Sequence, residues 1–372
     1  MTMHAEPMLL NALSSSDRDW VIDAVDRINA DANRSADTHL VKVELPCLRG
    51  IDLYLKDEST HPSGSLKHRL ARSLFLYGLC NGRIRRGTPI IEASSGSTAI
   101  SEAYFARFLG LPFIAVVPDG TAREKCEQIE FYGGECRRVP AERMYDEAAQ
   151  LAERIDGHNM DQFTTAERAT DWRGNNNIAE SLFTQMAMER HPVPRWIVTS
   201  AGTGGTSATI GRYLRYRPAH ESTTRLCVAD PEHSVFYDYF RTGDATLRSA
   251  RMSRIEGIGR PRVEPSFLPE VIDAMIRVPD ASSLSTMRWL ETVLGRRCGG
   301  STGTNMYAAA TIIADMAARG ERGSVVTMIC DGGDRYLDTY YDDAWVEAQG
   351  LDLAPCLDRL VRFAKTGQLD AS

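Results

Sequence analysis

The stretch Trp196-Ile-Val-Thr-Ser-Ala-Gly-Thr-Gly-Gly-Thr-Ser207 joins an apolar run to a glycine-rich turn and then to a helical pattern. The run 196–200 is typical of a buried strand, and a helical period starts at Ser207. Glycines let backbone N–H groups approach a ligand closely, and a helix start attracts an anion, so the turn suits a phosphate. The motif lacks the lysine of a Walker loop and the glycine spacing of a dinucleotide loop. A small monophosphate therefore fits better than a nucleotide, and the alternative is a plain tight turn.

The same alternation of apolar runs and helical patterns continues along most of the chain and predicts an α/β fold with parallel sheets. Predicted strands cover 53–56, 90–93, 113–117, 136–139, 196–200, 226–229 and 325–330. Predicted helices cover 99–109, 123–132, 142–154, 178–189, 207–216 and 305–318, and a helix-like run lies near 357–363. We expect a smaller α/β domain over 62–161 and a larger one formed by 1–61 and 162–372, with a cleft between them.

Composition narrows the classes of function. The chain has 372 residues, 43% of them hydrophobic, and a net charge of −7 with no run of basic residues, which argues against nucleic acid as a partner. No apolar stretch approaches the roughly 20 residues of a membrane span, and the N-terminus lacks a signal-peptide pattern, so we expect a cytoplasmic protein with no membrane partner. The eight cysteines show no metal-ligand or redox spacing, and we predict no metal site.

Lys67 is one of five lysines and lies in the stretch His61-Pro-Ser-Gly-Ser-Leu-Lys-His-Arg69. Apolar residues with helical spacing begin beside it, so we expect it in the first turn of a helix. A helix N-terminus and burial both disfavour the charged form of an amine. A neutral amine is what a Schiff base requires. On this segment alone, a solvated surface lysine is an equally good interpretation.

Two further turns carry polar groups at the ends of predicted strands. Glu92-Ala-Ser-Ser-Gly-Ser-Thr-Ala99 is rich in hydroxyls at a helix start, where a carboxylate can bind, although ordinary N-capping is the alternative. Cys330-Asp-Gly-Gly-Asp-Arg-Tyr336 places an aspartate at the carboxyl end of a strand, where ligands bind in such sheets, unless it is simply a turn. The arginine-rich segment 241–262 is either a loop beside the cleft or a surface connection.

In their order and separation, these segments resemble the cysteine synthase and cystathionine β-synthase family of fold type II pyridoxal-phosphate enzymes. The resemblance covers roughly residues 40–340. It implies two open, twisted, mostly parallel sheets flanked by helices, with pyridoxal 5'-phosphate in the cleft between the domains, and a homodimer. Ile255-Glu-Gly-Ile-Gly259 is similar to the family's segment beside the cofactor, and Gly300-Ser-Thr-Gly303 to its substrate-side turn.

The resemblance also implies roles for individual residues. Lys67 would carry the cofactor, and the cofactor's phosphate would lie in the loop formed by Gly202, Thr203, Gly204, Gly205 and Thr206. The substrate's carboxylate would be held by Ser94, Ser95, Gly96 and Thr98, with Gln162 in the segment Asp161-Gln-Phe163 as a further contact.

Three departures from the family pattern bear on the reaction. Asp331 stands where the family has a serine facing the pyridine nitrogen, and a carboxylate there makes the ring a stronger electron sink. Ser97 replaces the asparagine that contacts the ring oxygen. His68 replaces an aspartate, and we interpret it as an exposed helical histidine.

With these departures the chain resembles the bacterial L-cysteine desulfhydrase branch, which implies elimination of L-cysteine to sulfide, pyruvate and ammonia, with Lys67 as the base at Cα. The alternative is a β-replacement of the cysteine synthase type on O-acetylserine or a related activated serine. A serine or threonine dehydratase, or an inactive partner subunit, fits the motifs less well.

Overall fold

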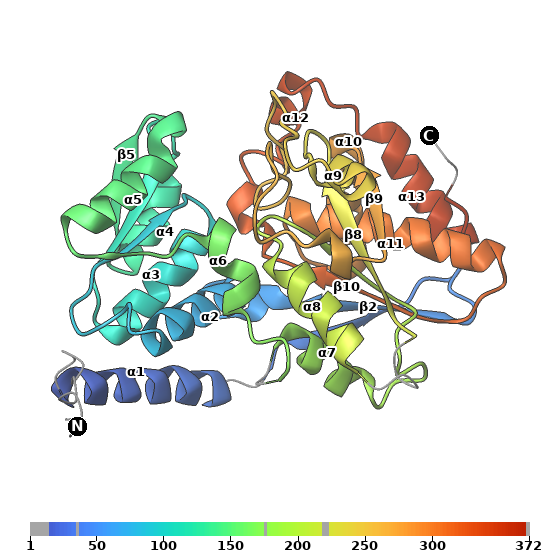
Figure 1. The fold of residues 1–372 in the computed structure, drawn as a ribbon. Coiled ribbons are helices and arrows are strands. Elements are labelled where there is room, and N and C mark those ends of the chain that lie inside the picture. The colour runs from blue at the N-terminus through green and yellow to red at the C-terminus, as the bar shows by residue number, and fades with distance from the viewer. Residues whose placement is uncertain (1–14, 35–36, 175–176, 218–222, 370–372) are drawn as a thin grey trace.

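The computed structural model describes residues 15–34, 37–174, 177–217 and 223–369, and its strands form two separate sheets (Figure 1). The larger sheet has the order β1-β2-β10-β7-β8-β9 and the smaller one the order β5-β4-β3-β6. All neighbouring strands pair in parallel except β1 and β2, which are antiparallel. The predicted α/β fold with two mostly parallel sheets is therefore confirmed.

The central strands are buried along their whole length, as expected of parallel sheets covered on both faces. The larger sheet contains β1 (His39–Val43), β2 (Ile51–Asp57), β7 (Trp196–Ser200), β8 (Arg225–Pro231), β9 (Ala274–Val278) and β10 (Gly323–Ile329). The smaller sheet contains β3 (Ile90–Ala93), β4 (Phe113–Pro118), β5 (Glu135–Val139) and β6 (His158–Asn159). The seven predicted strands are all present. The three that were not predicted, β1, β6 and β9, lie at the edges of the sheets.

Helices flank both sheets (Figure 1). Those at or near the smaller sheet are α1 (Ser15–Arg34), α2 (Lys67–Cys80), α3 (Ser97–Leu109), α4 (Arg123–Phe131), α5 (Met144–Arg154) and α6 (Gln162–Ala169). The others are α7 (Ile178–Met186), α8 (Gly205–Tyr216), α9 (Phe236–Thr242), α10 (Asp280–Leu294), α11 (Gly300–Ala318), α12 (Asp343–Ala348) and α13 (Ala354–Thr366). The predicted helices are confirmed with ends shifted by a few residues. In the described part of the chain, no helix is long and apolar enough to cross a bilayer.

Helix α1 packs against α2, and its buried residues Ala24 and Ile28 belong to the same apolar cluster as Leu74 and Phe75. The N-terminal helix thus contacts the layer beside the smaller sheet, whereas β1 and β2 belong to the larger sheet. We propose that residues 62–161 form one domain and that residues 1–61 and 162–372 together form the other.

A buried ion pair ties α2 to the larger sheet. Glu58 directly follows β2 and is fully buried, and Arg69 of α2 donates to its two carboxylate oxygens at 2.6 and 3.0 Å. Arg69 also donates to Asp37, just before β1, at 2.8 Å. Burial opposes ionisation of Glu58, but the guanidinium beside it holds the pKa of this carboxyl well below its usual range. The position of α2, and of Lys67 at its start, therefore depends on this pair.

We expect Arg69→Met to destabilise the protein by about 3 to 5 kcal/mol at neutral pH, because it leaves the Glu58 charge buried without its partner. Since the folded-state pKa of Glu58 is depressed, the stability that the pair contributes is present above its unfolded pKa of 4.5 and is lost as pH falls below it. The deficit of the variant should thus shrink in acid. Urea unfolding at neutral and acidic pH measures both effects. The control is Arg123→Met, which removes an exposed pair with Glu127 and should cost less than about 1 kcal/mol. Equal losses in the two variants would contradict the assignment.

Candidate active site

The carboxyl ends of β3, β7 and β10 face a single cavity of about 380 Å³, where the two sheets approach each other. This is the place where open α/β sheets bind ligands. The cavity is lined by every predicted site residue except one: Lys67, Ser94, Ser95, Gly96, Ser97, Thr98, Gln162, Gly202, Thr203, Gly204, Thr206 and Asp331. The fold thus brings together residues that are more than 260 positions apart in the chain.

Lys67 is the first residue of α2, as its segment predicts. Its helix start is fixed to the end of β10, because the Leu66 N–H donates to the Cys330 carbonyl at 2.8 Å and Ser65 forms an isolated bridge with Asp331. Burial lowers the pKa of the Lys67 amine, with a smaller contribution from Arg260, although nearby acidic groups oppose the shift. Lys67 therefore lies in the cavity rather than on a solvated surface.

The segment Gly202–Thr206 forms the turn between β7 and α8, and its glycines are required by their surroundings. A Cβ on Gly202 would lie 2.2 Å from the Gly257 carbonyl oxygen, and one on Gly204 would lie 2.4 Å from the Ser266 carbonyl oxygen. Gly204 also has φ +88°, which favours glycine. The first N–H groups of α8 have no partners within the helix, so the turn offers donors to an anion.

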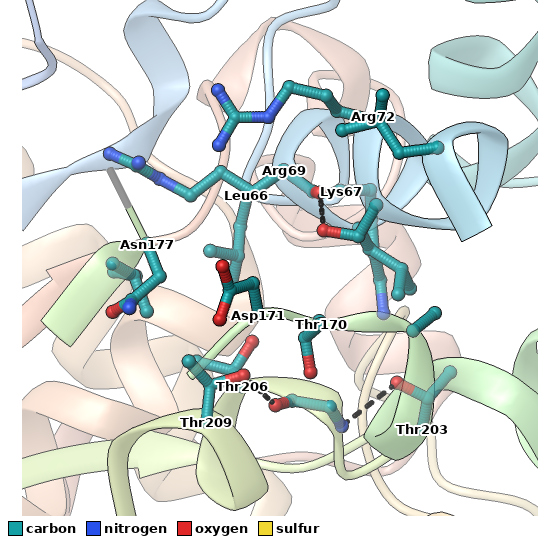
Figure 2. A pocket seen from close by; sticks show the side chains of 16 residues that line it. Leu66, Lys67, Arg69, Arg72, Thr170, Asp171, Asn177, Thr203, Thr206 and Thr209 are labelled. Atoms are coloured by element: carbon teal, nitrogen blue, oxygen red, sulfur yellow. Dashed lines mark hydrogen bonds between the residues drawn. The ribbon is translucent and has the colours of Figure 1, made fainter. Parts of the chain in front are cut away.

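Gly205 is the predicted residue that does not line the first cavity; it lines an adjoining cavity of about 240 Å³ between α2 and α8. The two cavities share Leu66, Lys67, Thr203 and Thr206. Figure 2 shows the Lys67 side chain reaching from α2 toward Thr203 on the turn. The Lys67 amine and the anion-binding turn thus face each other. This arrangement suits a ligand that is bonded to the lysine and also carries a phosphate group.

The loop Ser94–Thr98 leads from β3 into α3, and it is connected to Gln162 at the start of α6. The Thr98 hydroxyl donates to the Gln162 side-chain oxygen at 2.8 Å. Glu92 accepts from both the main-chain and the side-chain nitrogen of Gln162, at 3.3 and 3.4 Å. The loop Ser94–Thr98 and Gln162, which are both predicted to contact the substrate's carboxylate, are therefore connected by hydrogen bonds.

Asp331 is buried at the end of β10. One carboxylate oxygen accepts a hydrogen bond from the Tyr336 hydroxyl at 2.6 Å, and the other has no partner among the residues that the structure describes. Burial raises the pKa of this carboxyl to about 6, although the Tyr336 hydrogen bond opposes the rise. Arg335 donates to the Ser97 hydroxyl at 2.8 Å. The motif 330–336 contains Arg335 and Tyr336 as well, but the sequence alone indicates a role only for Asp331.

The interpretation of His68 as an exposed residue is wrong. His68 is buried, its ring stacks on that of His61 at 4.9 Å, and its Nδ1 lies 3.0 Å from the Ser63 hydroxyl. Burial holds the pKa of this histidine well below its usual range, so it is neutral. Its position one residue after Lys67 turns it toward α3, where Phe105 packs on it.

Of the two interpretations of the arginine-rich segment, the structure favours the loop beside the cleft, because residues 252, 253 and 255–260 line the cavity. Glu256 forms an ion pair with Lys125 at 2.7 Å, and Arg260 donates to the Tyr145 hydroxyl at 2.7 Å. This wall, which follows β8 of the larger sheet, therefore contacts two helices beside the smaller sheet. Gly300–Gly303 is the first turn of α11 rather than a separate turn, and Ser301 lines the cavity.

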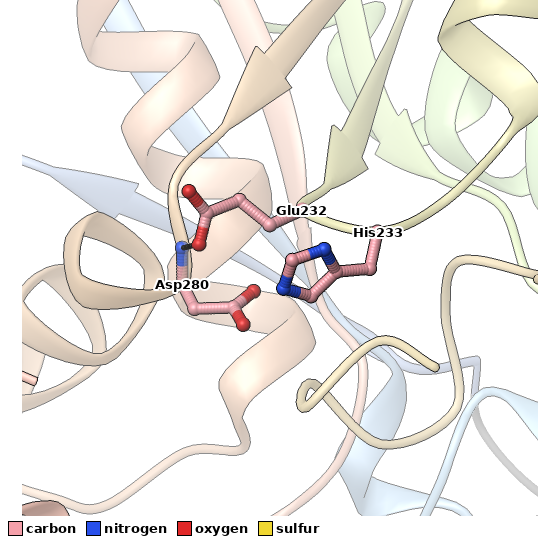
Figure 3. A group of neighbouring side chains, drawn as sticks. All are labelled: Glu232, His233 and Asp280. Carbon is pink, nitrogen blue, oxygen red and sulfur yellow. Dashed lines mark hydrogen bonds between the residues drawn. The ribbon is translucent and has the colours of Figure 1, made fainter. Parts of the chain in front are cut away.

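Another group of ionisable side chains, Glu232, His233 and Asp280, lies at the carboxyl ends of β8 and β9 (Figure 3). Their ligand atoms lie within 4.8 Å of one another. Glu232 accepts from the first N–H of α10 at 3.1 Å, and Arg254 lies 3.3 Å from the Asp280 carboxylate. Arg254 and the start of α10 already compensate much of the negative charge of Glu232 and Asp280. We therefore interpret this group as structural.

Comparison with known proteins identifies the family. The family model described as "Pyridoxal-phosphate dependent enzyme" matches residues 35–331, which is most of the chain and contains every predicted site residue. The chain belongs to the pyridoxal-phosphate dependent enzyme family. Its curated relatives include "L-cysteine desulfhydrase Cds1" of Mycobacterium tuberculosis, 57% identical over 95% of this chain and 97% of the relative. A "Putative cysteine synthase" of Sinorhizobium fredii is 30% identical over 84% of this chain and 90% of that protein. Among solved structures, that of O-ureido-L-serine synthase matches with a TM-score of 0.70 at 25% identity, over 88% of this chain and 98% of the other.

The cavity of this pyridoxal-phosphate dependent enzyme fits its cofactor in three respects. The turn 202–206 packs against the backbone at Gly257 and Ser266 because Gly202 and Gly204 have no side chain, and the start of α8 offers N–H donors to a phosphate. Asp331 lines the cavity, and one of its carboxylate oxygens has no hydrogen-bond partner among the described residues, so this carboxylate can accept from a protonated pyridine nitrogen. Lys67, which lines the same cavity, supplies the amine.

We expect Gly202→Ala to weaken binding of pyridoxal phosphate at least about tenfold, equivalent to about 1.4 kcal/mol, because the added methyl collides with the Gly257 carbonyl and displaces the turn. The absorbance of bound cofactor during titration measures the effect. Gly120→Ala is the control, since Gly120 has no neighbour within 4 Å of an added Cβ and should leave binding unchanged. Equal affinity in the two variants would mean that the phosphate binds elsewhere.

Proposed function

We propose that this enzyme catalyses the β-elimination of L-cysteine to sulfide, pyruvate and ammonia. The observation that carries the proposal is the buried Asp331 carboxyl with an unpartnered oxygen at the cavity wall. Its position corresponds to a serine in the biosynthetic synthases that the chain resembles. The relative named L-cysteine desulfhydrase supports the same reaction, because it is 57% identical over nearly the whole length of both proteins.

The lining of the cavity indicates which residues would hold the cofactor. Lys67 would bond to it, the turn Gly202–Thr206 would receive its phosphate, and Asp331 and Ser97 would hold its ring. When bound, pyridoxal phosphate accepts the electron pair that is left when the Cα–H bond of an amino acid breaks. A carboxylate at the ring nitrogen strengthens this capacity, because it favours the protonated ring.

The chain's own residues then orient the substrate and move a proton. The loop Ser94–Thr98, together with Gln162, binds the carboxylate of L-cysteine. The released Lys67 amine, whose pKa burial lowers, removes the proton from Cα and becomes an ammonium. The Cβ–S bond breaks next, and the sulfur leaves with the bonding pair as hydrosulfide. The remaining three-carbon fragment is hydrolysed to pyruvate and ammonia.

The second candidate is β-replacement, in which an activated serine loses its leaving group and a nucleophile adds at Cβ. The similarity to a protein named as a putative cysteine synthase and to the structure of O-ureido-L-serine synthase favours this alternative. Both reactions use the same residues up to the loss of the leaving group. They differ in whether a second nucleophile is consumed, so products decide between them.

We also propose that the enzyme is a cytoplasmic homodimer whose partners are small amino acids and not nucleic acid or membrane. All eight cysteines are free thiols in the structure, which fits a reducing compartment. The net charge of −7 disfavours a polyanion partner. The homodimer follows from the resemblance to the cysteine synthase family, and light scattering of the purified protein measures it.

The purified protein supplied with L-cysteine alone is expected to release sulfide and pyruvate in equal amounts, and colorimetric assays of both products measure this ratio. Lys67→Ala is the control and should give no product above background, because the base at Cα is lost. Pyruvate that is absent until a second nucleophile is added would identify β-replacement instead.

Asp331→Ser is expected to lower kcat for L-cysteine by about tenfold to a hundredfold, the range that corresponds to losing a hydrogen bond to a charged group. Steady-state kinetics measure kcat, with Asp334→Ser as the control, since that aspartate is exposed three residues further along. An Asp331→Ser variant with unchanged kcat would show that Asp331 does not contact the ring nitrogen.

A further inference from the structure

Arg260 is a basic side chain in the cavity wall to which the proposed reaction gives no role. In the described part of the chain, the basic residues that line the 380 Å³ cavity are Lys67, Lys125 and Arg260. Lys67 is the proposed base. Lys125 forms its ion pair with Glu256 at 2.7 Å, and both of these side chains are more than a third exposed to solvent. The Arg260 side chain is only 13% exposed, so water screens its charge less than that of Lys125.

The structure holds Arg260 in place from both sides of the cavity. Its N–H donates to the Ser234 hydroxyl at 3.2 Å and its carbonyl accepts from the Val235 N–H at 2.9 Å, just after β8. Its Nη2 donates to the Tyr145 hydroxyl of α5 at 2.7 Å. The guanidinium carbon lies 4.0 Å from the centre of the Phe163 ring in α6. The charge is therefore fixed in position before any ligand binds, as electrostatic stabilisation of a reacting group requires.

The acid beside Arg260 does not neutralise it fully. The Arg260 Nε donates to Glu264 at 2.8 Å, and Arg262 donates to both oxygens of the same carboxylate at 3.1 and 3.3 Å. Because two guanidiniums share one carboxylate, the three side chains carry a net positive charge. The third nitrogen of Arg260, Nη1, has no hydrogen-bond partner among the described residues. Arg260 can therefore offer both charge and a donor to an anion in the cavity.

The proposed reaction involves three anionic groups, and only two of them have donors so far. The phosphate of the cofactor has the turn Gly202–Thr206, and the carboxylate of the substrate has the loop Ser94–Thr98 with Gln162. The third anion is the hydrosulfide that forms when the Cβ–S bond breaks. Hydrogen sulfide is a weak acid, so its anion is a poor leaving group and gains from a donor at the place where its charge develops.

The walls of the cavity restrict where the substrate's side chain lies. Lys67 must reach Cα and the loop Ser94–Thr98 must reach the carboxylate, so the side chain faces one of the remaining walls. Arg260 lines the same cavity and lies over Phe163, the residue after Gln162. After burial, the charge of Arg260 is the group that lowers the pKa of the Lys67 amine, as expected of a neighbour in one cavity. The wall at Arg260 is therefore suited to receive the sulfur.

We propose that Arg260 is a catalytic residue that stabilises the hydrosulfide as it leaves Cβ, through its positive charge and its free Nη1 donor. The Cβ–S bond breaks and its electron pair stays on the sulfur, which keeps its own proton. The pair left at Cα by proton removal forms the double bond to Cβ. The guanidinium gives up no proton, because arginine stays charged in proteins. The proposal rests on the proposed function, since hydrosulfide is the leaving group of L-cysteine.

The test compares two leaving groups in the full-length enzyme loaded with pyridoxal phosphate. Chloride is the anion of a strong acid and leaves without help, so β-chloro-L-alanine is the matched substrate for L-cysteine, and pyruvate measures both reactions. Arg260→Gln should lower kcat for L-cysteine about a hundredfold, the range for losing one donor to a developing anion, and should change kcat for β-chloro-L-alanine little. Equal losses with the two substrates would overturn the proposal.

Arg262→Gln is the matched control. Arg262 donates to the same Glu264 and lies over the Tyr145 ring, 4.8 Å from its centre, but it is 41% exposed and does not line the cavity. Its loss should lower kcat for L-cysteine by no more than about fivefold, as expected for an exposed charge. A control variant that loses as much as Arg260→Gln would assign the effect to the fold around Glu264 and overturn the proposal.

Two further measurements separate the leaving group from the other anions. Titration with pyridoxal phosphate, followed by absorbance, should give the same affinity for Arg260→Gln and the wild type. Exchange of the α-proton of L-alanine in deuterated water, measured at its pH optimum, should also be unchanged, because alanine has no leaving group. Cofactor binding weakened at least about tenfold would assign Arg260 to the phosphate, and slower exchange with a raised KM would assign it to the carboxylate. Either result would overturn the proposal.

Arg260→Lys decides the case in which Arg260→Gln does not fold. Lysine has an ordinary pKa of about 10.4 and loses its charge in base, whereas arginine does not. The ratio of the L-cysteine rate to the β-chloro-L-alanine rate, divided by the same ratio for the wild type, should therefore fall as pH rises toward about 10. The wild type corrects for titration of the substrates and of Lys67. A relative ratio that does not change with pH would overturn the proposal.

The wild type itself separates this proposal from the proposed function. No sulfide from L-cysteine, with pyruvate still formed from β-chloro-L-alanine, would reject the proposed function and with it the role of Arg260. Sulfide release by the wild type, together with equal losses for the two substrates in Arg260→Gln, would reject the role of Arg260 alone and leave the proposed function intact.

Discussion

The placement of α2 depends on the ion pair between Glu58 and Arg69, since it joins the end of β2 in the larger sheet to the helix that begins with Lys67. A buried pair contributes little net free energy compared with apolar residues, but breaking it is costly, so it selects one arrangement of the two halves. That arrangement directs the Lys67 amine to the turn after β7. The position of Lys67 therefore relies on a contact between two side chains that do not line the 380 Å³ cavity.

The buried acidic residues of the protein are of two kinds. Glu58 is surrounded by donors and stays ionised, whereas Glu92, Glu102 and Asp331 are buried with unmatched oxygens or weak partners and have raised pKa values. The first kind maintains the fold. Of the second kind, Asp331 lines the cavity, and Glu92 and Glu102 flank the cavity-lining loop Ser94–Thr98 in the chain.

The sequence was sufficient to predict the α/β class, the central strands and the residues that meet in the cavity, because buried parallel strands and glycine turns leave strong local signals. It could not place β6, a strand of two polar residues whose pairing with β3 comes from tertiary contact. His68 was misjudged, since a histidine among charged neighbours shows no local sign of the Phe105 and His61 rings that cover it. Glu102 is a charged residue in a helix, which the sequence alone would place at the surface. Only the packing of α3 on α2 reveals that it is buried.

The contact between Gly202 and the Gly257 carbonyl oxygen links two walls of the cavity that are separate in the chain. Because the turn and the loop 252–260 fill each other's space, their sequences must change together, both in evolution and in the laboratory. The turn also meets the helix of the opposite wall, because a Cβ on Gly205 would lie 3.2 Å from the Cβ of Ala166 in α6, the helix that begins with Gln162. A substitution in the turn therefore affects both walls of the cavity.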